Sequence, residues 1–295
     1  MPRRYPHSSI GKYSSYSLRC LWTLLDIHQE KKAARSYQDG KKKFMKSISI
    51  IGAGPGAPDL LTLRALERIK NAEVLIWTDS LVSPQIAALA PQECKQIRTS
   101  TLTLEEILLL LIKESKEGKR VVRLHDGDPC LFGAMSEQIC RLAEEGIEVE
   151  VIPGISAYQA TAARLKKELT VPGVVQTIVL SRSAGRTGMP ESEDLESLAA
   201  IRATLCLYLS ARHITEVQQT LLKHYPKDTP VAIGYRVTWQ DEWIKTIPLK
   251  DMAATSKSMN LIRTTLYIIS PALSTHYQQR SRLYSNEHKH LFRKK

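Results

Sequence analysis

Four short loops carry most of the residues in this chain that could do chemistry. They cover residues 52–59, 125–133, 153–157 and 181–187, and each contains glycine together with other small, acidic or basic residues. Each follows a short apolar run of the kind that forms a buried strand. Because open α/β sheets bind ligands at the carboxyl ends of their strands, we interpret these loops as the candidate binding segments.

The first loop has glycines at the spacing of a dinucleotide-binding turn. Gly52, Gly54 and Ala57 fit the pattern Gly-x-Gly-x-x-Gly/Ala after a strand. That motif holds a pyrophosphate with a helix N-terminus and backbone N–H groups, whereas Pro55 and Pro58 have no N–H to donate. The glycines are equally consistent with a tight turn that holds no ligand.

The second loop places two carboxylates at a predicted strand end. Asp126 and Asp128 could bind a ribose, a cation or an ammonium group, or they could cap a helix and form turn hydrogen bonds. His125 is adjacent, but a metal site would need further oxygen or imidazole ligands. We therefore predict no metal site.

The fourth loop carries Arg182 and Arg186 among small residues. The guanidinium group is a planar fork that suits carboxylates. These residues indicate either an acidic small-molecule ligand or two solvated surface arginines.

Strands and helices alternate along the middle of the chain. Apolar runs predict strands over residues 47–51, 74–77, 120–124, 148–152, 177–181, 204–209, 231–235 and 266–270, with an antiparallel excursion at 243–248. Helices are predicted near residues 60–69, 104–112, 136–143, 194–201 and 214–222, with Thr103 placed to cap the second. This alternation predicts an α/β fold with a mainly parallel sheet covered on both faces.

The chain divides into four segments. We expect residues 1–44 to be a disordered basic extension, residues 45–169 and 170–273 to be two α/β domains, and residues 274–295 to be a basic tail. Met45 directly precedes the first strand, so the extension is interpreted as sequence upstream of the natural start. An Arg/Ser-rich transit peptide is the alternative.

The net charge of +12 is concentrated at the two ends. Residues 1–46 hold a net +8 and residues 274–295 a net +5, which leaves the body at −1. This distribution argues against a specific nucleic-acid interface on the body. No apolar run is long enough to span a membrane, and the five cysteines form no Cys-x-x-Cys pair. We therefore expect a cytoplasmic protein with no membrane partner.

Taken together, the loops resemble the tetrapyrrole methylase family over residues 48–273. The segments that carry this resemblance are residues 50–62 (IIGAGPGAPDLLT), Gly127-Asp128-Pro129 with Phe132-Gly133, and residues 153–157 (PGISA). Three further stretches resemble the precorrin-4 members of the family: residues 79–84 (DSLVSP) followed by 103–107 (TLEEI), residues 168–172 (ELTVP), and residues 176–190, which begin QTIVLSR. Asp126 and Cys130 stand where the family pattern has serine, Asp79 where glycine is usual, and Gly188 where proline is usual.

The resemblance implies two α/β domains with a ligand trough between them and S-adenosylmethionine in that trough. The residues that would contact this cofactor are Pro55, Asp126, Gly127, Asp128, Phe132, Ser156, Ala157, Leu209, Ala232 and Thr265. Those that would border or hold a tetrapyrrole substrate are Gly54, Gly56, Ser80, Arg182, Arg186 and Arg236. The family is typically homodimeric, and no single catalytic residue is implied.

The activity implied by the resemblance is methylation of carbon 11 of precorrin-4 or cobalt-precorrin-4 in cobalamin biosynthesis. The nucleophile would be an electron-rich ring carbon and the leaving group a neutral thioether, so positioning should dominate over acid–base catalysis. Alternatives within the family are uroporphyrinogen-III, rRNA ribose and diphthine methylases. The absence of arginine after Gly133 and the loop of residues 185–187 argue against them.

Two alternatives come from other classes of protein. One is a dinucleotide-binding oxidoreductase, against which Pro55 and Pro58 argue. The other is a binding protein whose basic ends contact RNA and whose enzyme fold is inactive.

Overall fold

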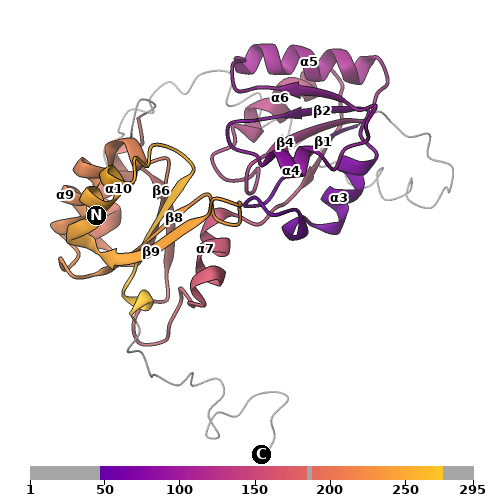
Figure 1. The fold of residues 1–295 in the computed structure, drawn as a ribbon. Helices are drawn as coiled ribbons and strands as arrows, with labels where there is room; N and C mark the ends of the chain where they lie inside the picture. The colour runs from indigo at the N-terminus through magenta and orange to yellow at the C-terminus, as the bar shows by residue number, and fades with distance from the viewer. Residues whose placement is uncertain (1–46, 185–187, 275–295) are drawn as a thin grey trace, which may run out of the picture.

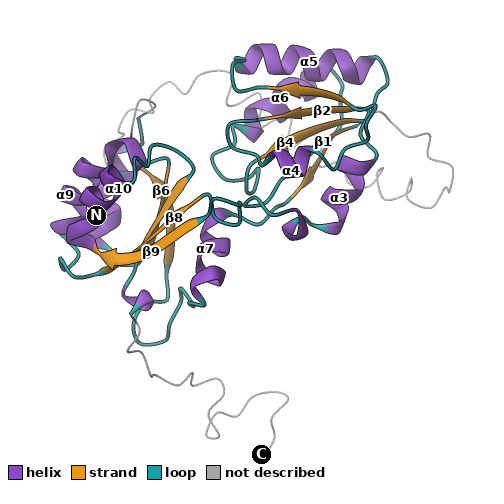
Figure 2. Cartoon of the chain, in the orientation of Figure 1, coloured by secondary structure: helices purple, strands orange, loops and turns teal. Residues whose placement is uncertain are grey.

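Two five-stranded sheets form the centre of the chain (Figures 1 and 2). The computed structural model describes residues 47–184 and 188–274. The predicted extension, the predicted tail from residue 275 onward and Arg186 lie outside the described residues. The first sheet has the order β3-β2-β4-β1-β5 and all its strands are parallel. These strands are β1 (Ile48–Gly52), β2 (Val74–Trp77), β3 (Lys95–Arg98), β4 (Val121–His125) and β5 (Val149–Ile152).

Helices cover both faces of the first sheet. α3 (Leu63–Lys70) and α4 (Pro84–Ala87) pack on one face, and α5 (Leu104–Lys116) and α6 (Met135–Glu144) pack on the other. Successive side chains of a strand point to opposite faces, so Ile51 joins the core beside α3 and Ile50 joins the core beside α5. Burial on both faces explains why these strands are continuous apolar runs in the sequence.

The second sheet is mixed, with the order β6-β7-β10-β8-β9. Its strands are β6 (Ile178–Arg182), β7 (Thr204–Tyr208), β8 (Pro230–Tyr235), β9 (Trp243–Pro248) and β10 (Thr265–Ile269). β6 and β7 are parallel, whereas β10 runs antiparallel to both β7 and β8, and β9 is antiparallel to β8. The α/β class and the antiparallel strand at residues 243–248 are confirmed, and the parallel arrangement holds for the first sheet only.

Helices also cover both faces of the second sheet. α8 (Leu195–Ala200), α9 (Ile214–Leu222) and α10 (Met252–Ser258) pack on one face, and α7 (Ala157–Leu165) packs on the other. α7 directly follows the last strand of the first sheet, yet its apolar side chains contact the second sheet. The domain boundary near residue 169 stays a prediction, with α7 as the helix that joins the two sheets.

Four elements are absent from the sequence prediction: β3, α4, α7 and α10. β3 has the sequence KQIR and lies at the sheet edge with most of its side chains exposed, so it lacks an apolar run. α4 is a single turn of four residues, too short for helical periodicity to show. Among the described residues, no helix is long and apolar enough to cross a membrane.

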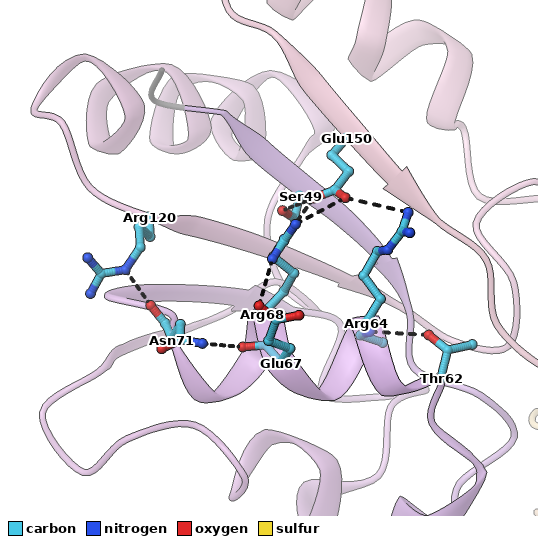
Figure 3. A network of polar contacts seen from close by, with 9 residues as sticks. Ser49, Thr62, Arg64, Glu67, Arg68, Asn71, Arg120 and Glu150 are labelled. Atoms are coloured by element: carbon cyan, nitrogen blue, oxygen red, sulfur yellow. Dashed lines mark hydrogen bonds and ion pairs between the residues drawn. The ribbon is translucent and has the colours of Figure 1, made fainter. Parts of the chain in front are cut away.

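An ionic network fastens α3 to the edge strand β5 (Figure 3). Arg68 donates two hydrogen bonds to the Glu150 carboxylate, at 2.8 and 3.3 Å, and Ser49 of β1 donates a third at 3.3 Å. The bond from Arg68 holds the pKa of Glu150 below its usual value. Because both groups are partly exposed, this bidentate pair orients the helix more than it adds to stability.

The start of α5 provides a direct test of the link between sequence and fold. Thr103 accepts a hydrogen bond from the Glu106 amide at 3.3 Å, and the Glu106 side chain accepts one from the Thr103 amide at 2.7 Å. This capping box satisfies two amides that the helix itself leaves without partners.

We expect Thr103→Ala to lower the free energy of unfolding by about 1 kcal/mol, because it removes the hydroxyl acceptor of the capping box. Urea unfolding followed by circular dichroism measures the change. Thr103→Ser keeps the hydroxyl and should stay near the parent. Equal midpoints for the alanine variant and the parent would contradict this role.

Candidate functional site

A cavity of about 340 Å³ lies where loops of the two sheets meet. Its lining comes from the carboxyl ends of β1, β4 and β5 in the first sheet and of β7 and β8 in the second. The start of β10 also contributes, because β10 runs antiparallel and its amino end therefore lies beside the carboxyl ends of β7 and β8. The volume falls in the range of about 300–1,000 Å³ that is usual for small-molecule sites.

The loops after β1 and β4 are joined through their backbones. Gly54 and Gly127 exchange two hydrogen bonds, at 2.9 and 3.1 Å, and the Ala53 amide donates to the His125 carbonyl at 2.7 Å. These bonds extend the pairing of two neighbouring strands beyond the end of the sheet. The glycine-rich loop is thus part of the cavity wall.

Three backbone segments cross at one point beneath the cavity. A Cβ atom on Gly52 would lie 2.5 Å from the Gly154 nitrogen, and one on Gly154 would clash with the Gly127 carbonyl oxygen. Only glycine allows the loops after β1, β4 and β5 to approach so closely.

Asp128 ties this crossing together. One carboxylate oxygen accepts from the Cys130 amide at 2.8 Å, and the other accepts from the Gly154 amide at 2.9 Å. Both oxygens are therefore engaged by backbone. The turn-forming alternative for Asp128 is the one that the geometry supports, and a direct contact of its carboxylate with a ligand would compete with these two bonds.

Asp126 differs from Asp128 although it follows the same strand. In the part of the chain that the structure describes, its carboxylate accepts no hydrogen bond except from its own amide, and it forms no ion pair. The residue is accessible from the cavity that it lines. Desolvation by the surrounding protein raises the pKa of Asp126, while the buried cation of Arg123 acts in the opposite direction.

Two other titratable groups of the lining are neutral at pH 7. Burial lowers the pKa of His125 to about 4, with a further contribution from Arg123, so the imidazole carries no charge. Burial raises the pKa of Tyr208 to about 12. The Tyr208 hydroxyl lies 2.7 Å from the Ser156 hydroxyl, which links β7 to the first turn of α7.

Four residues of the lining have a left-handed backbone although they are not glycine. They are Phe132, Leu209, Arg236 and Thr264, with φ between 43 and 56°. Such a conformation is strained for residues with a side chain, and strained residues gather at functional sites. Phe132 and Leu209 are also 46% and 64% exposed, which is unusual for large apolar side chains and suits a site that a ligand covers.

The turn between β8 and β9 contacts the glycine-rich loop of the first sheet (Figure 1). Thr238 accepts from the Ala57 amide at 2.9 Å, and the Trp239 indole donates to the Pro55 carbonyl at 2.9 Å. Gly56 lies directly against the Trp239 ring, which leaves no room for a side chain there. This contact joins a turn of the second sheet to the loop that contributes Gly54 and Pro55 to the cavity lining.

The arginines predicted to bind substrate occupy different surroundings. Arg182 donates to the carbonyls of Ser183, Ala184 and Gly188, so its guanidinium organises its own loop and does not line the cavity. Arg236 does line it, paired with Asp241 and stacked over the Trp239 ring at 5.0 Å.

Arg212 and Arg263 line the cavity, are exposed, and were missed by the sequence reasoning. Arg212 follows β7 and Arg263 precedes β10, so the rule that ligands bind beyond the carboxyl ends of strands could have indicated Arg212.

The structure brings together most of the predicted cofactor and substrate residues. Those in the lining are Gly54, Pro55, Asp126, Gly127, Asp128, Phe132, Ser156, Ala157, Leu209, Arg236 and Thr265. Four predicted residues are not in the lining: Gly56, Ser80, Arg182 and Ala232. Gly56 packs on Trp239, and Ala232 is buried in the second sheet. At the third position, Leu81 lines the cavity and Ser80 does not.

Comparison with known proteins identifies the family. Residues 47–253 match the family model of the tetrapyrrole (corrin/porphyrin) methylases. The chain belongs to this family. A precorrin-4 C(11)-methyltransferase of Pseudomonas aeruginosa is 41% identical over 247 residues, which cover 84% of this chain and 98% of that one.

Solved structures show the same fold as this tetrapyrrole methylase. A cobalt precorrin-4 methyltransferase aligns with a TM-score of 0.75 and 36% identity, over 78% of this chain and 97% of the other. A uroporphyrin-III C-methyltransferase from Thermus thermophilus, in complex with S-adenyl homocysteine, aligns with a TM-score of 0.65 and 26% identity. That alignment covers 77% of this chain and 98% of the other. The predicted recognition and the fold of two α/β units around a trough are confirmed.

The position of Asp128 in this tetrapyrrole methylase leads to a prediction. Asp128→Asn places an NH2 group against one of two backbone amides, which leaves a donor without an acceptor. We expect a loss of about 1–3 kcal/mol in the free energy of unfolding. Urea unfolding measures it, with the exposed Asp59→Asn outside the cavity as the matched control.

An Asp128→Asn variant with the parent's unfolding midpoint but without ligand binding would contradict the structural role. Asp128 would then contact the ligand directly.

Proposed function

We propose that this tetrapyrrole methylase transfers the methyl group of S-adenosylmethionine to carbon 11 of precorrin-4 or cobalt-precorrin-4. The strongest support is that this chain aligns with nearly the full length of relatives named precorrin-4 C(11)-methyltransferase, at 36–41% identity. The motifs at residues 79–84 and 176–190, which resemble precorrin-4 members, support the same assignment. A cytoplasmic location and a homodimer remain predictions.

The residues of the cavity fit S-adenosylmethionine. Phe132, Leu209 and Ile262 offer exposed apolar surface for the adenine ring, and Asp126 offers a carboxylate without a protein partner for a cationic group. The Thermus thermophilus relative in complex with S-adenyl homocysteine supports the use of this cofactor. When bound, the cofactor supplies an electrophilic methyl group on a positively charged sulfur.

The protein's part in this reaction is to position the reactants. Transfer would form a bond from the ring carbon to the methyl carbon and break the bond from sulfur to methyl, so that the sulfur would leave as a neutral thioether and the methylated ring would release one proton. His125 is neutral and buried, and Tyr208 keeps its proton, so neither is poised as a strong base at pH 7. The rigid crossing at Gly52, Gly127 and Gly154 instead holds the wall of the site in place.

Arg212 and Arg263 are the strongest candidates for holding the substrate. Both line the cavity, and within residues 47–184 and 188–274 neither forms an ion pair with a carboxylate of the protein. A tetrapyrrole of this class carries several carboxylates, each of which a guanidinium can bind through two parallel hydrogen bonds. We assign them this role in place of Arg182, whose guanidinium is occupied by its own loop.

Methylation assayed with defined substrates tests the proposed function. We expect the purified protein, S-adenosylmethionine and precorrin-4 or cobalt-precorrin-4 to give a product heavier by one methyl group, located on carbon 11 by NMR. Uroporphyrinogen-III is the matched control and should stay unmethylated. Methylation of uroporphyrinogen-III alone would contradict the assignment within the family.

Replacing the cavity arginines should weaken use of the substrate. We expect Arg212→Ala and Arg263→Ala each to raise the KM for the tetrapyrrole about tenfold or more, because a charge-assisted contact contributes about 1.5–3 kcal/mol. Arg141→Ala, an exposed change on α6 outside the cavity, should leave KM unchanged. Unchanged KM values for both cavity variants would refute the role.

A further inference from the structure

One of the two carboxylates that line the cavity has no protein partner beyond its own amide. Asp126 and Asp128 are the acidic residues of the lining among the described residues. Both oxygens of Asp128 accept backbone amides, so its charge is already compensated by hydrogen bonds. The Asp126 carboxylate is accessible from the cavity and accepts only from its own amide.

The protein around Asp126 leaves its charge largely uncompensated. The cation that acts on Asp126 is Arg123 of β4, which is 5% exposed. Its guanidinium donates to Thr78 at 3.2 Å and to Thr99 and the Ile76 carbonyl at 3.4 Å. These are neutral acceptors, so Arg123 forms no ion pair with Asp126. His125 is neutral, and the arginines of the lining come from the second sheet.

The cofactor and its product differ in one respect that a carboxylate can sense. S-adenosylmethionine carries a positive charge on sulfur, and S-adenosylhomocysteine, which remains after transfer, does not. Their ribose, adenine and amino-acid groups are otherwise the same. A sulfonium has no N–H or O–H to donate, so a site can favour it over the thioether only through electrostatic attraction, and a carboxylate supplies a full negative charge for this.

We propose that Asp126 is a specificity-determining residue that favours the cationic cofactor over its neutral product. The proposal rests on the proposed function, because it requires S-adenosylmethionine in this cavity. A cavity of about 340 Å³ is only about 7 Å across, which is less than the screening length of about 8 Å in physiological salt. Salt therefore does not screen Asp126 from a charge bound in the cavity. The preference for the charged form eases release of the product after each transfer.

Calorimetric titration with three ligands at about pH 8 tests this inference. The ligands are S-adenosylmethionine, S-adenosylhomocysteine, and sinefungin, in which a carbon bearing an ammonium group replaces the sulfonium. The proteins are the parent, Asp126→Asn and Asp126→Ser, with Glu105→Gln, at the exposed start of α5 outside the cavity, as a control of equal charge change. Thermal unfolding of each variant shows whether it is folded.

We expect both Asp126 variants to bind S-adenosylmethionine and sinefungin more weakly, on the order of tenfold, and S-adenosylhomocysteine within about twofold of the parent. Glu105→Gln should bind all three as the parent does.

Two results would overturn the inference. An equal loss of affinity for all three ligands means that Asp126 binds the ammonium group that they share. Unchanged affinities mean that Asp126 interacts with neither that ammonium group nor the sulfonium. Failure of the parent to bind S-adenosylmethionine and S-adenosylhomocysteine would instead refute the proposed function, which keeps the two outcomes apart.

Discussion

The crossing of three loops at Gly52, Gly127 and Gly154, held by the Asp128 carboxylate, is the constraint on which the site depends. The loops come from neighbouring strands, β4, β1 and β5, so the order of the sheet brings them together before any side chain is considered. Asp128 then adds hydrogen bonds that close the remaining gap between the loops. A ligand beside this crossing meets a wall made of backbone, which has less freedom to move than a wall of side chains.

The second half of the site is positioned by different means. The turn after β8 reaches the first sheet through Thr238 and Trp239, and Arg236 stands at its base with a left-handed backbone. α7 follows the first sheet but packs against the second. These two connections join the sheets on either side of the cavity. The first depends on Gly56, which leaves room for Trp239, and the second depends on α7, which follows one sheet and packs on the other.

Much of the fold could be predicted from the sequence because most strands are buried on both faces and therefore appear as apolar runs. β3 could not, since an exposed edge strand such as KQIR resembles a loop in composition. The mixed order of the second sheet could not either, because apolar patterning gives the position of a strand but not its direction. Only the excursion at residues 243–248 indicated antiparallel pairing.

The candidate site shows the same division. The loops that line the cavity could be identified from their composition and from the strands before them. The different surroundings of Asp126 and Asp128 could not be predicted, because both residues follow β4. Asp128 accepts hydrogen bonds from the amides of two other residues, whereas Asp126 accepts one only from its own amide. Arg182 was assigned to substrate from its residue type and from the family resemblance, whereas its guanidinium donates to three carbonyls of its own loop.

Charge is divided between the two sides of the described cavity. The acidic residues of the lining, Asp126 and Asp128, follow a strand of the first sheet, and its arginines, Arg212, Arg236 and Arg263, come from the second. The proposed reaction joins a cationic methyl donor to a polyanionic acceptor, which need opposite surroundings, and this division would give each its own side. The donor would lose its charge when its methyl group is transferred. Since the attraction between the donor and Asp126 would weaken in the same step, the arrangement proposed to bring the reactants together would also help them to separate.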